Sequence, residues 1–345
     1  RLAERIATES MVLLKNDGIL PLRRGAKVAY LGGFAAKPRY QGGGSSHINS
    51  TRVSSALECA PEGVVYEEAF PADRDERNEE AVERAVRAAK DAETAVIFAG
   101  LPDSFESEGY DRSHMRLPDC QNELIRRVLE VQKRVVVVLH CGSPVETPWA
   151  DEVPAVLCMY LGGEGVGEAT DALLYGDANP CGRLAETWPL RLEDNPSYLN
   201  FPGDEDGVSY AEGVYIGYRY YDKKKMAVRW PFGHGESYTT FAYSNVRLSS
   251  EGEKVRVLVD VTNTGACAGK ETVQLYVEDC TGTPGRPVRE LKGIKKLSLL
   301  PGEMKTAELE LDDRSLSWYS EKLHDWYAAS GSYRILLAHS SRDVR

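Results

Sequence analysis

The sequence predicts a mostly parallel α/β sheet followed by an all-β sandwich. In the first half of the chain, continuously apolar runs such as "TAVIFAG" (94–100) alternate with amphipathic or charged helical stretches about every thirty residues. This alternation is typical of parallel strands that are covered by helices on both faces. After residue 242, short segments with period-two alternation are separated by turn residues, a pattern typical of a sandwich of about a hundred residues.

The α/β part is expected to begin with an amphipathic helix, because Leu2, Ile6, Leu13 and Leu14 are spaced along one helical face. A further helix is expected to be capped by Ser50 or Thr51. In total, the predicted helices are 2–15, 51–60, 74–93, 121–133 and 164–176. The predicted strands between them are 27–33, 64–70, 94–101, 134–142 and 155–163.

The pattern breaks down from about residue 183, where aromatic and turn residues become frequent. We therefore expect three parts: an α/β domain over 1–190, an aromatic-rich connector over 191–241 that wraps the domains, and a β-sandwich over 242–345. The strands of the sandwich are predicted at 244–250, 254–265, 270–279, 288–299, 305–311 and 331–341.

Charge and composition restrict the class of partner. The chain of 345 residues has 42 basic and 53 acidic residues, a net charge of −11. Nucleic acids and anionic membranes are bound by basic stripes, so we expect neither as a partner. No apolar run is long enough to cross a membrane.

The cysteines and the N-terminal residues bear on the compartment. The seven cysteines are widely spaced, with no CxxC pair and no zinc-ligand spacing, so they are expected to be free thiols and no metal site is predicted. The first residues, "RLAERIATES", lack the apolar core of a signal peptide. Both features predict a cytoplasmic protein, although the chain starts at Arg1 without a Met and its termini are expected to be missing.

Two loops are the best candidates for a site. Ligands of parallel sheets bind at the carboxyl ends of the strands. The long polar loops "GGFAAKPRYQGGGSSHIN" (32–49) and "LPDSFESEGYDR" (101–112) leave two of these ends. The glycine-rich stretch at 42–46 has neither the Lys-Ser/Thr ending of a phosphate-binding loop nor dinucleotide-fold spacing, so no cofactor is expected.

Six motifs together resemble glycoside hydrolase family 3, in its β-glucosidase branch. In chain order they are "ESMVLLKNDGILPL", "GGGSS", "SEGYDR", "VVVVLHCGSPVE", "LGGEGVGEATDALLYGDANPCGRLAETWP" and "WPFGHGESYTTF". The resemblance implies an (α/β)6 sandwich followed by a fibronectin type III-like domain. It also implies a catalytic nucleophile, an Asp, in a separate (β/α)8 barrel, which has no counterpart in these 345 residues.

The resemblance assigns the general acid/base to Glu108, in the "EGYDR" motif. Retaining glycosidases need two carboxyl groups about 5 Å apart on opposite faces of a sugar. Glu106 and Glu108 would project to the same side of an extended loop, so the loop is expected to supply half of a site. Asp111 and Arg112 are expected to pair and support this loop, or to form a surface ion pair only. By resemblance, Ser45, Ser46 and Gly44 are expected to approach the substrate.

Other candidates are assigned structural roles. Glu106 and Asp103 are expected to be solvated carboxylates, and His47 and His140 to be structural. The tyrosines of "YIGYRYYD" (215–222) are expected to pack in the connector, with sugar stacking as the alternative.

The sequence leads to three competing functional hypotheses. The first is part of a retaining β-glycosidase that hydrolyses terminal non-reducing β-D-glucosyl residues of oligosaccharides or aryl glycosides, or a β-xylosidase of the same family. Its barrel, from the same gene product, would precede Arg1 or follow Arg345. The second is a non-catalytic carbohydrate-binding or scaffold protein. The third, an independent α/β hydrolase, would need a GxSxG motif, which is absent.

Overall fold

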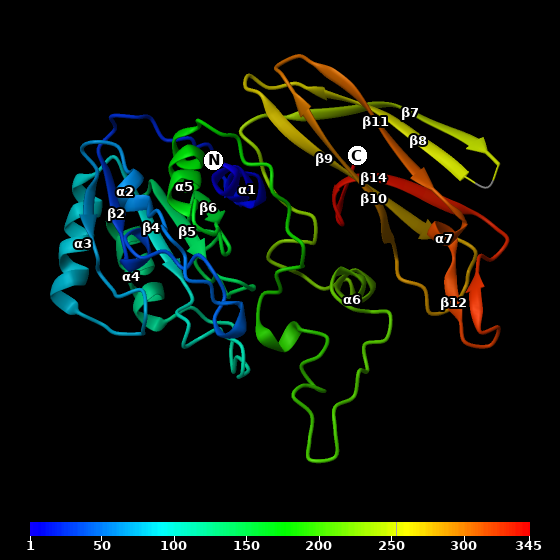
Figure 1. The fold of residues 1–345 in the computed structure, drawn as a ribbon, viewed down its shortest axis with the longest axis horizontal. Coiled ribbons are helices and arrows are strands. Elements are labelled where there is room, and N and C mark those ends of the chain that lie inside the picture. Colours follow the sequence, from blue (N-terminus) through cyan, green and yellow to red (C-terminus); the bar gives the residue numbers. More distant parts are fainter. Residues whose placement is uncertain (253) are drawn as a thin grey trace. The chain divides into compact units, whose positions relative to one another are not determined.

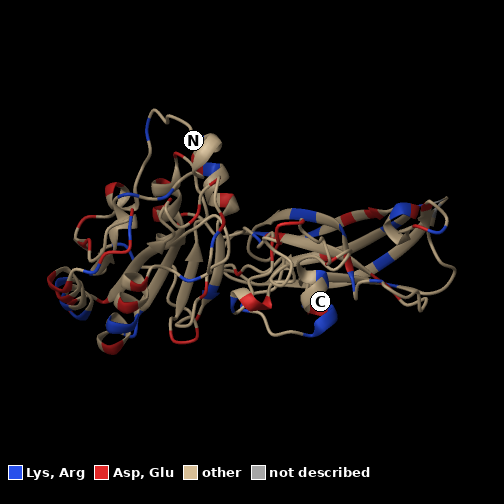
Figure 2. Cartoon of the chain, turned by 90° about the horizontal axis from the view of Figure 1, so that it is seen from below, with Lys and Arg blue, Asp and Glu red and all other residues tan. Residues whose placement is uncertain are grey.

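The computed structural model describes residues 1–252 and 254–345. By its internal contacts the chain divides into two units. Unit 1 contains Arg1–Gly182 and Gly235–Tyr238, and unit 2 contains Arg183–His234 and Thr239–Arg345. The predicted limits of the α/β domain, the connector and the sandwich, at residues 190 and 241, are limits of independently folding parts. They stay predictions. Acidic and basic residues alternate along the chain in both units (Figure 2).

Unit 1 is built on a six-stranded sheet in the order β1-β6-β5-β4-β2-β3 (Figure 1). All neighbouring strands are parallel except β1, which runs antiparallel to β6. The mostly parallel sheet is therefore confirmed. The strands are β1 (Val12–Asn16), β2 (Val28–Leu31), β3 (Val65–Glu67), β4 (Thr94–Gly100), β5 (Val135–His140) and β6 (Ala155–Cys158).

The helices of unit 1 form two packing groups. Helix α5 contacts α1 and α2, whereas α3 contacts α4. In Figure 1, α3 and α5 lie on opposite sides of β2 and β4. Every residue of β4, β5 and β6 is buried, as continuously apolar runs predict for strands covered on both faces. The helices are α1 (Leu2–Ser10), α2 (Ala56–Cys59), α3 (Glu79–Asp91), α4 (Asp119–Val131) and α5 (Val166–Tyr175).

Two helix predictions were wrong in their limits. The first helix ends at Ser10, and the following residues form β1, whose apolar side chains are fully buried against β6. Leu2 and Ile6, expected on a buried face, are exposed. Helix α2 is capped by Ser55, not by Ser50 or Thr51, because Ser55 and Glu58 exchange the two hydrogen bonds of a capping box.

The strand order places a switch point between β2 and β4. From β2 the chain moves to β3 on one side, and from β3 it crosses back to β4 on the other. At such a point the loops that leave the two carboxyl ends diverge and open a crevice, which is where ligands bind in these sheets. The two candidate loops leave β2 and β4 at this edge. The first includes the short helices η1 (Gly33–Ala35) and η2 (Gly44–Ser46).

Unit 2 contains two antiparallel sheets that enclose an apolar core. The first has the order β10-β9-β14-β15 and the second β11-β8-β7. Along β8, Val257, Val259 and Val261 alternate into the core with no exposed area, as period-two patterning predicts. The all-β sandwich is therefore confirmed. The strands are β7 (Phe241–Glu251), β8 (Lys254–Asn263), β9 (Gly269–Asp279), β10 (Glu290–Leu299), β11 (Met304–Leu311), β14 (Tyr333–Ser340) and β15 (Asp343–Val344).

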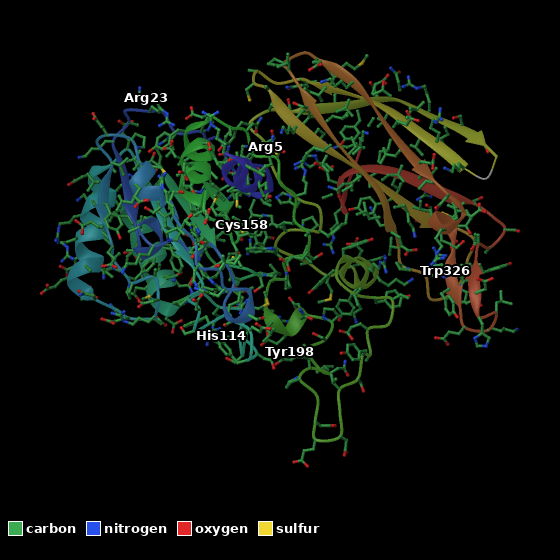
Figure 3. The ribbon with its side chains drawn as sticks, viewed as in Figure 1. Arg5, Arg23, His114, Cys158, Tyr198 and Trp326 are labelled. Atoms are coloured by element: carbon green, nitrogen blue, oxygen red, sulfur yellow. The ribbon has the colours of Figure 1, made fainter. Side chains whose placement is uncertain are left out.

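Unit 2 also has elements that the periodicity did not predict. Strands β12 (Trp318–Ser320) and β13 (Asp325–Tyr327) form a two-stranded ribbon that carries Trp326, labelled in Figure 3. The segment before the sandwich contains η3 (Leu192–Asp194) and α6 (Tyr218–Lys224), and α7 (Asp313–Leu316) precedes β12. In α6, Tyr218 stacks on Phe232 with ring centroids 4.7 Å apart. It also contacts Tyr276 of β9 edge-on and accepts a hydrogen bond from the N–H of Leu291, so it packs against both the connector and the sandwich.

Candidate functional site

Three loops meet at the carboxyl edge of the sheet in unit 1. They follow β2, β4 and β5. The loop after β4 carries Glu108, and the other two loops contact it. Residues Ser45 and Arg39 come from the first loop, and Gly142 and Ser143 from the third. His114, labelled in Figure 3, marks the loop between β4 and α4.

Glu108 is exposed and is held from one side only. Its Oε2 atom accepts a hydrogen bond from the backbone N–H of Ser45 at 2.5 Å and another from the Ser45 hydroxyl. Gly44, at φ +77°, lies so close to the side chain of Glu108 that a Cβ atom there would collide with it. The structure thus brings together Glu108, Gly44 and Ser45, three of the predicted site residues.

The hydroxyl of Ser45, followed by its backbone N–H, lowers the pKa of Glu108 below its ordinary value. Both donors stabilise the carboxylate relative to the acid. The neighbouring Ser46 takes no part, since its hydroxyl donates to the carbonyl of Gly43. These donors favour the charged form of Glu108, so in this environment its carboxyl group is poorly suited to donate a proton. Proton donation would need a less polar environment around the same carboxyl group.

Glu106 and Glu108 do not project to the same side, as an extended loop would require. The backbone N–H groups of Phe105 and Glu106 both donate to the carbonyl of Pro102, so the chain turns here. Gly109 then adopts a φ of +93°. The two carboxylates consequently face different loops: that of Glu108 faces Ser45, and that of Glu106 faces the loop after β5.

The prediction that Glu106 is a solvated carboxylate was also wrong. Only 16% of its side chain is exposed. Its Oε2 atom accepts from the N–H of Gly142 at 2.7 Å, and its Oε1 atom accepts from the hydroxyl of Ser143. Its main partner is Arg39, whose Nη1 atom lies 2.5 Å from Oε2. Glu106 is therefore partly buried and paired with Arg39.

Arg39 was not singled out from the sequence, yet it is the buried cation of this edge. Its side chain is 6% exposed. It donates to the carbonyl oxygens of Glu106, at 2.5 Å, and of Leu101, at 3.3 Å. Its Nε atom lies 3.2 Å from Asp103, which is mostly exposed. An arginine between the first strand and the glycine-rich stretch was the only sequence signal for this role.

Arg112 supports the loop, but without Asp111. It donates to the Ser143 hydroxyl at 2.7 Å and to the carbonyl of Pro144 at 3.1 Å, and lies 3.9 Å from Glu106. Burial lowers its pKa. Within the described part of the chain, Asp111 forms no ion pair with it, because the guanidinium group points inward and Asp111 remains exposed.

The two histidines differ in environment. His140, at the end of β5, is buried, and its ring stacks on those of Phe34 and Phe98. Burial lowers its pKa to about 4, so it is neutral at physiological pH. His47 is exposed, and its Nδ1 atom lies 3.2 Å from the side-chain amide of Gln41.

A cavity of about 610 Å³ opens beside the cluster, at the switch point of the sheet. It is bordered by the loops after β2, β3 and β4. Arg39 and Asp103 line it, whereas Glu108 does not. Its wall also includes the exposed ion pair between Arg74 and Glu76.

Three further features concern metal binding, membrane spans and the cysteines. Among residues 1–252 and 254–345, no group of three His, Cys, Asp or Glu side chains could hold a metal ion. Over the same residues, no helix has the length and apolar character to cross a bilayer. None of the seven cysteines forms a disulfide bond, including the buried Cys158 of β6 (Figure 3).

Comparison with protein families gives two matches along the chain. Residues 11–218 match the glycosyl hydrolase family 3 C-terminal domain. The chain belongs to glycosyl hydrolase family 3. Residues 271–341 match a fibronectin type III-like domain, so both halves of the family resemblance are confirmed.

Individual members of the family align with nearly the whole chain. Thermostable β-glucosidase B of Acetivibrio thermocellus is 49% identical over 100% of this chain and 47% of its own length. An exo-α-(1→6)-L-arabinopyranosidase of Bifidobacterium longum is 41% identical over 99% of this chain and 47% of its own. The crystal structure of a family 3 β-glucosidase from Bifidobacterium adolescentis superimposes with a TM-score of 0.96, at 42% identity, over 99% of this chain and 52% of that one. This family 3 chain thus spans about half of the length of these relatives.

Proposed function

We propose that this chain supplies the general acid/base of a retaining β-glycosidase that hydrolyses terminal non-reducing β-D-glucosyl residues. Glu108 is that acid/base. The Asp nucleophile lies in a (β/α)8 barrel domain of the same gene product. The observation that carries the proposal is the contrast between the two loop carboxylates: Glu106 is partly buried and paired with Arg39, whereas Glu108 is exposed at the carboxyl edge.

The reaction needs a second carboxylate, on the opposite face of the sugar. The nucleophile attacks the anomeric carbon while Glu108 protonates the departing oxygen. Glu108, now a carboxylate, then removes a proton from the water that releases the sugar. The family members compared above are about twice as long as this chain, which leaves room for a domain that carries the nucleophile.

The assembled site must raise the pKa of Glu108, which is lowered in this chain. A barrel placed over the loop would remove water from the carboxyl group and favour its neutral form. A sugar hydroxyl would then compete for Ser45. In this proposal Ser45, together with Ser46 and Gly44, approaches the substrate. The contact between Ser45 and Glu108 is then made only when no substrate is bound.

Glu108→Ala in the protein that contains the barrel tests the assignment. An activated aryl leaving group departs without a proton, so formation of the glycosyl-enzyme from a dinitrophenyl glucoside should change little. Cleavage of a disaccharide should fall on the order of 10² to 10⁴-fold, the range for a positioned proton donor. Azide needs no deprotonation and should restore turnover of the aryl substrate, with a β-glucosyl azide as product.

Two outcomes would contradict the assignment. An α-glucosyl azide would indicate that the vacated residue was the nucleophile. Azide rescue at Glu106→Ala, with Glu108→Ala near wild type, would move the acid/base to Glu106. As a further control, residues 1–345 alone should not turn over aryl β-glucosides, because they lack the proposed nucleophile domain.

The sugar specificity has a second candidate. The arabinopyranosidase relative matches 99% of this chain, so an aryl α-L-arabinopyranoside belongs beside β-glucosides and β-xylosides in the substrate panel. A scaffold protein that binds carbohydrate without cleaving it would be inactive on all three, even with the barrel present.

A cytoplasmic location also stays a prediction.

A further inference from the structure

The ion pair between the buried Arg39 and the partly buried Glu106 connects the three loops of the site. Arg39 comes from the loop after β2 and Glu106 from the loop after β4, and Glu106 also accepts hydrogen bonds from Gly142 and Ser143 after β5. The two charged residues are 67 positions apart in the sequence. The pair therefore joins the carboxyl ends of three strands, with Glu106 at the common point.

Both oxygens of Glu106 are occupied. Oε2 accepts from Arg39 and from the N–H of Gly142, and Oε1 accepts from the Ser143 hydroxyl. Arg39 also donates to the backbone carbonyl of Glu106 itself. The side chain and the main chain of one residue are thus held together, which restricts the rotation of the loop at this position. Charge-assisted bonds of this kind are among the strongest that side chains make.

Glu108, two residues farther along, lacks such support. Its carboxylate contacts Ser45, and its backbone is followed by Gly109 in a left-handed conformation. Glycine has more conformational freedom than any other residue. The placement of Glu108 therefore depends on the fixed point at residue 106.

We infer that Arg39 and Glu106 are positioning residues, which hold the loop of residues 101–112 so that the carboxyl group of Glu108 reaches the glycosidic oxygen. This inference rests on the proposed function of Glu108. Neither residue exchanges a proton with the substrate. Their effect arises because a displacement of about 1 Å at a reacting group can lower a rate on the order of 10²-fold.

The test compares two Arg–Glu pairs beside the same cavity. Glu106→Gln keeps the shape of the side chain but removes the charge that faces Arg39. Glu76→Gln makes the same change in the exposed pair with Arg74, which also lines the cavity but lies outside the loop cluster. Ser143→Ala is a milder second variant, because it removes one donor to Glu106 and leaves the ion pair intact.

The first measurement is amide hydrogen exchange on residues 1–345. The N–H groups of Phe105 and Glu106 donate to the carbonyl of Pro102, at 2.9 and 3.3 Å, and report whether the turn is closed. Glu106→Gln should accelerate their exchange, Ser143→Ala should do so to a smaller extent, and Glu76→Gln should have no effect. Unchanged exchange in both cluster variants would overturn the inference.

The second measurement uses the protein with its barrel and a series of aryl and alkyl glucosides. In Glu106→Gln, substrates with poor leaving groups should lose on the order of 10²-fold in kcat/KM, while a dinitrophenyl glucoside should lose little. A variant that only lowers the amount of folded protein would reduce all substrates by one factor, and that result would also overturn the inference. Azide should not rescue Glu106→Gln, since a rescue would make Glu106 a catalytic residue.

Glu108→Ala, measured in parallel, separates the inference from the proposed function. If Glu108→Ala is fully active on poor leaving groups, the proposed function fails. Accelerated exchange in Glu106→Gln would then still confirm that the pair holds the loop. If Glu108→Ala is inactive and Glu106→Gln behaves as wild type, the positioning role fails alone.

Discussion

At the scale of single residues, the contrast between Glu106 and Glu108 shows how two identical side chains acquire different chemistry. Because the chain turns at Pro102, the carboxylate of Glu106 lies among several hydrogen-bond donors, whereas that of Glu108 lies at the surface. A carboxylate held by several donors from different loops is costly to move, which suits a support. An exposed carboxylate can change its protonation state when its surroundings change, which suits an acid/base.

Ser45→Ala should raise the pKa of Glu108 toward its ordinary value in residues 1–345. The substitution removes the hydroxyl donor, the larger cause of the lowered pKa, and leaves the backbone N–H in place. The contact stabilises the folded chain above the ordinary pKa of a glutamate, and this contribution is lost as the pH falls through the lowered pKa. NMR titration of the Glu108 carboxyl carbon measures the change.

Ser46→Ala is the matched control for this titration. Ser46 is the next residue, but its hydroxyl donates to the carbonyl of Gly43 and not to Glu108. The control should therefore leave the pKa of Glu108 unchanged. An equal shift in both variants would show that the substitutions act through the backbone of the loop.

At the scale of elements, strand β9 carries a buried anion that joins distant parts of unit 2. Glu271 has no exposed area, and it bonds to Arg183, Tyr243 and His339. Burial by itself would raise the pKa of this carboxyl group. The hydrogen bond from His339 and the charge of Arg183 outweigh burial and lower the pKa to about 2.

Glu271→Gln should destabilise unit 2 by about 3–5 kcal/mol, because it leaves the charge of Arg183 buried without its counterion. Urea unfolding, followed by a probe within the sandwich, measures this loss. In the wild type, the contribution of Glu271 should be complete above the ordinary glutamate pKa of about 4.3. It should decline as the pH falls from there toward 2.

Glu310→Gln is the control for the sandwich. Glu310 pairs with Lys254 at 2.6 Å, but about half of each side chain is exposed. Such surface pairs contribute little to stability, because water screens the two charges. A loss at Glu310 as large as that at Glu271 would mean that burial does not set the strength of these pairs.

At the scale of the whole molecule, the connector contains strongly exposed apolar and aromatic side chains. Leu199 and Tyr210 are 91% and 89% exposed. Limited proteolysis should therefore cut first between residues 191 and 215 and release fragments that correspond to an α/β part and a sandwich part. Cleavage chiefly within β5 or β9 would contradict the predicted domain limits.

Much of this fold could be predicted from the sequence. The runs that form β4 and β5, the charged helix α3 and the alternation along β8 each reflect the burial of their own residues, which is visible within a few positions. The first helix was predicted too long because the apolar residues of Val12–Asn16 suit a strand as well as a helix. Only pairing with β6, far away in the chain, decides between the two.

The amino-acid sequence by itself determined the two fold classes, the carboxyl-end loops and the acidic, free-thiol character of the chain, because each is a property of composition or local period. The tertiary structure decided that the carboxylate of Glu106 is paired and that the carboxylate of Glu108 is exposed. Glu106 meets Arg39 and Ser143 across 67 and 37 residues, respectively. No local pattern encodes such contacts, since they exist only after the sheet has aligned the ends of its strands.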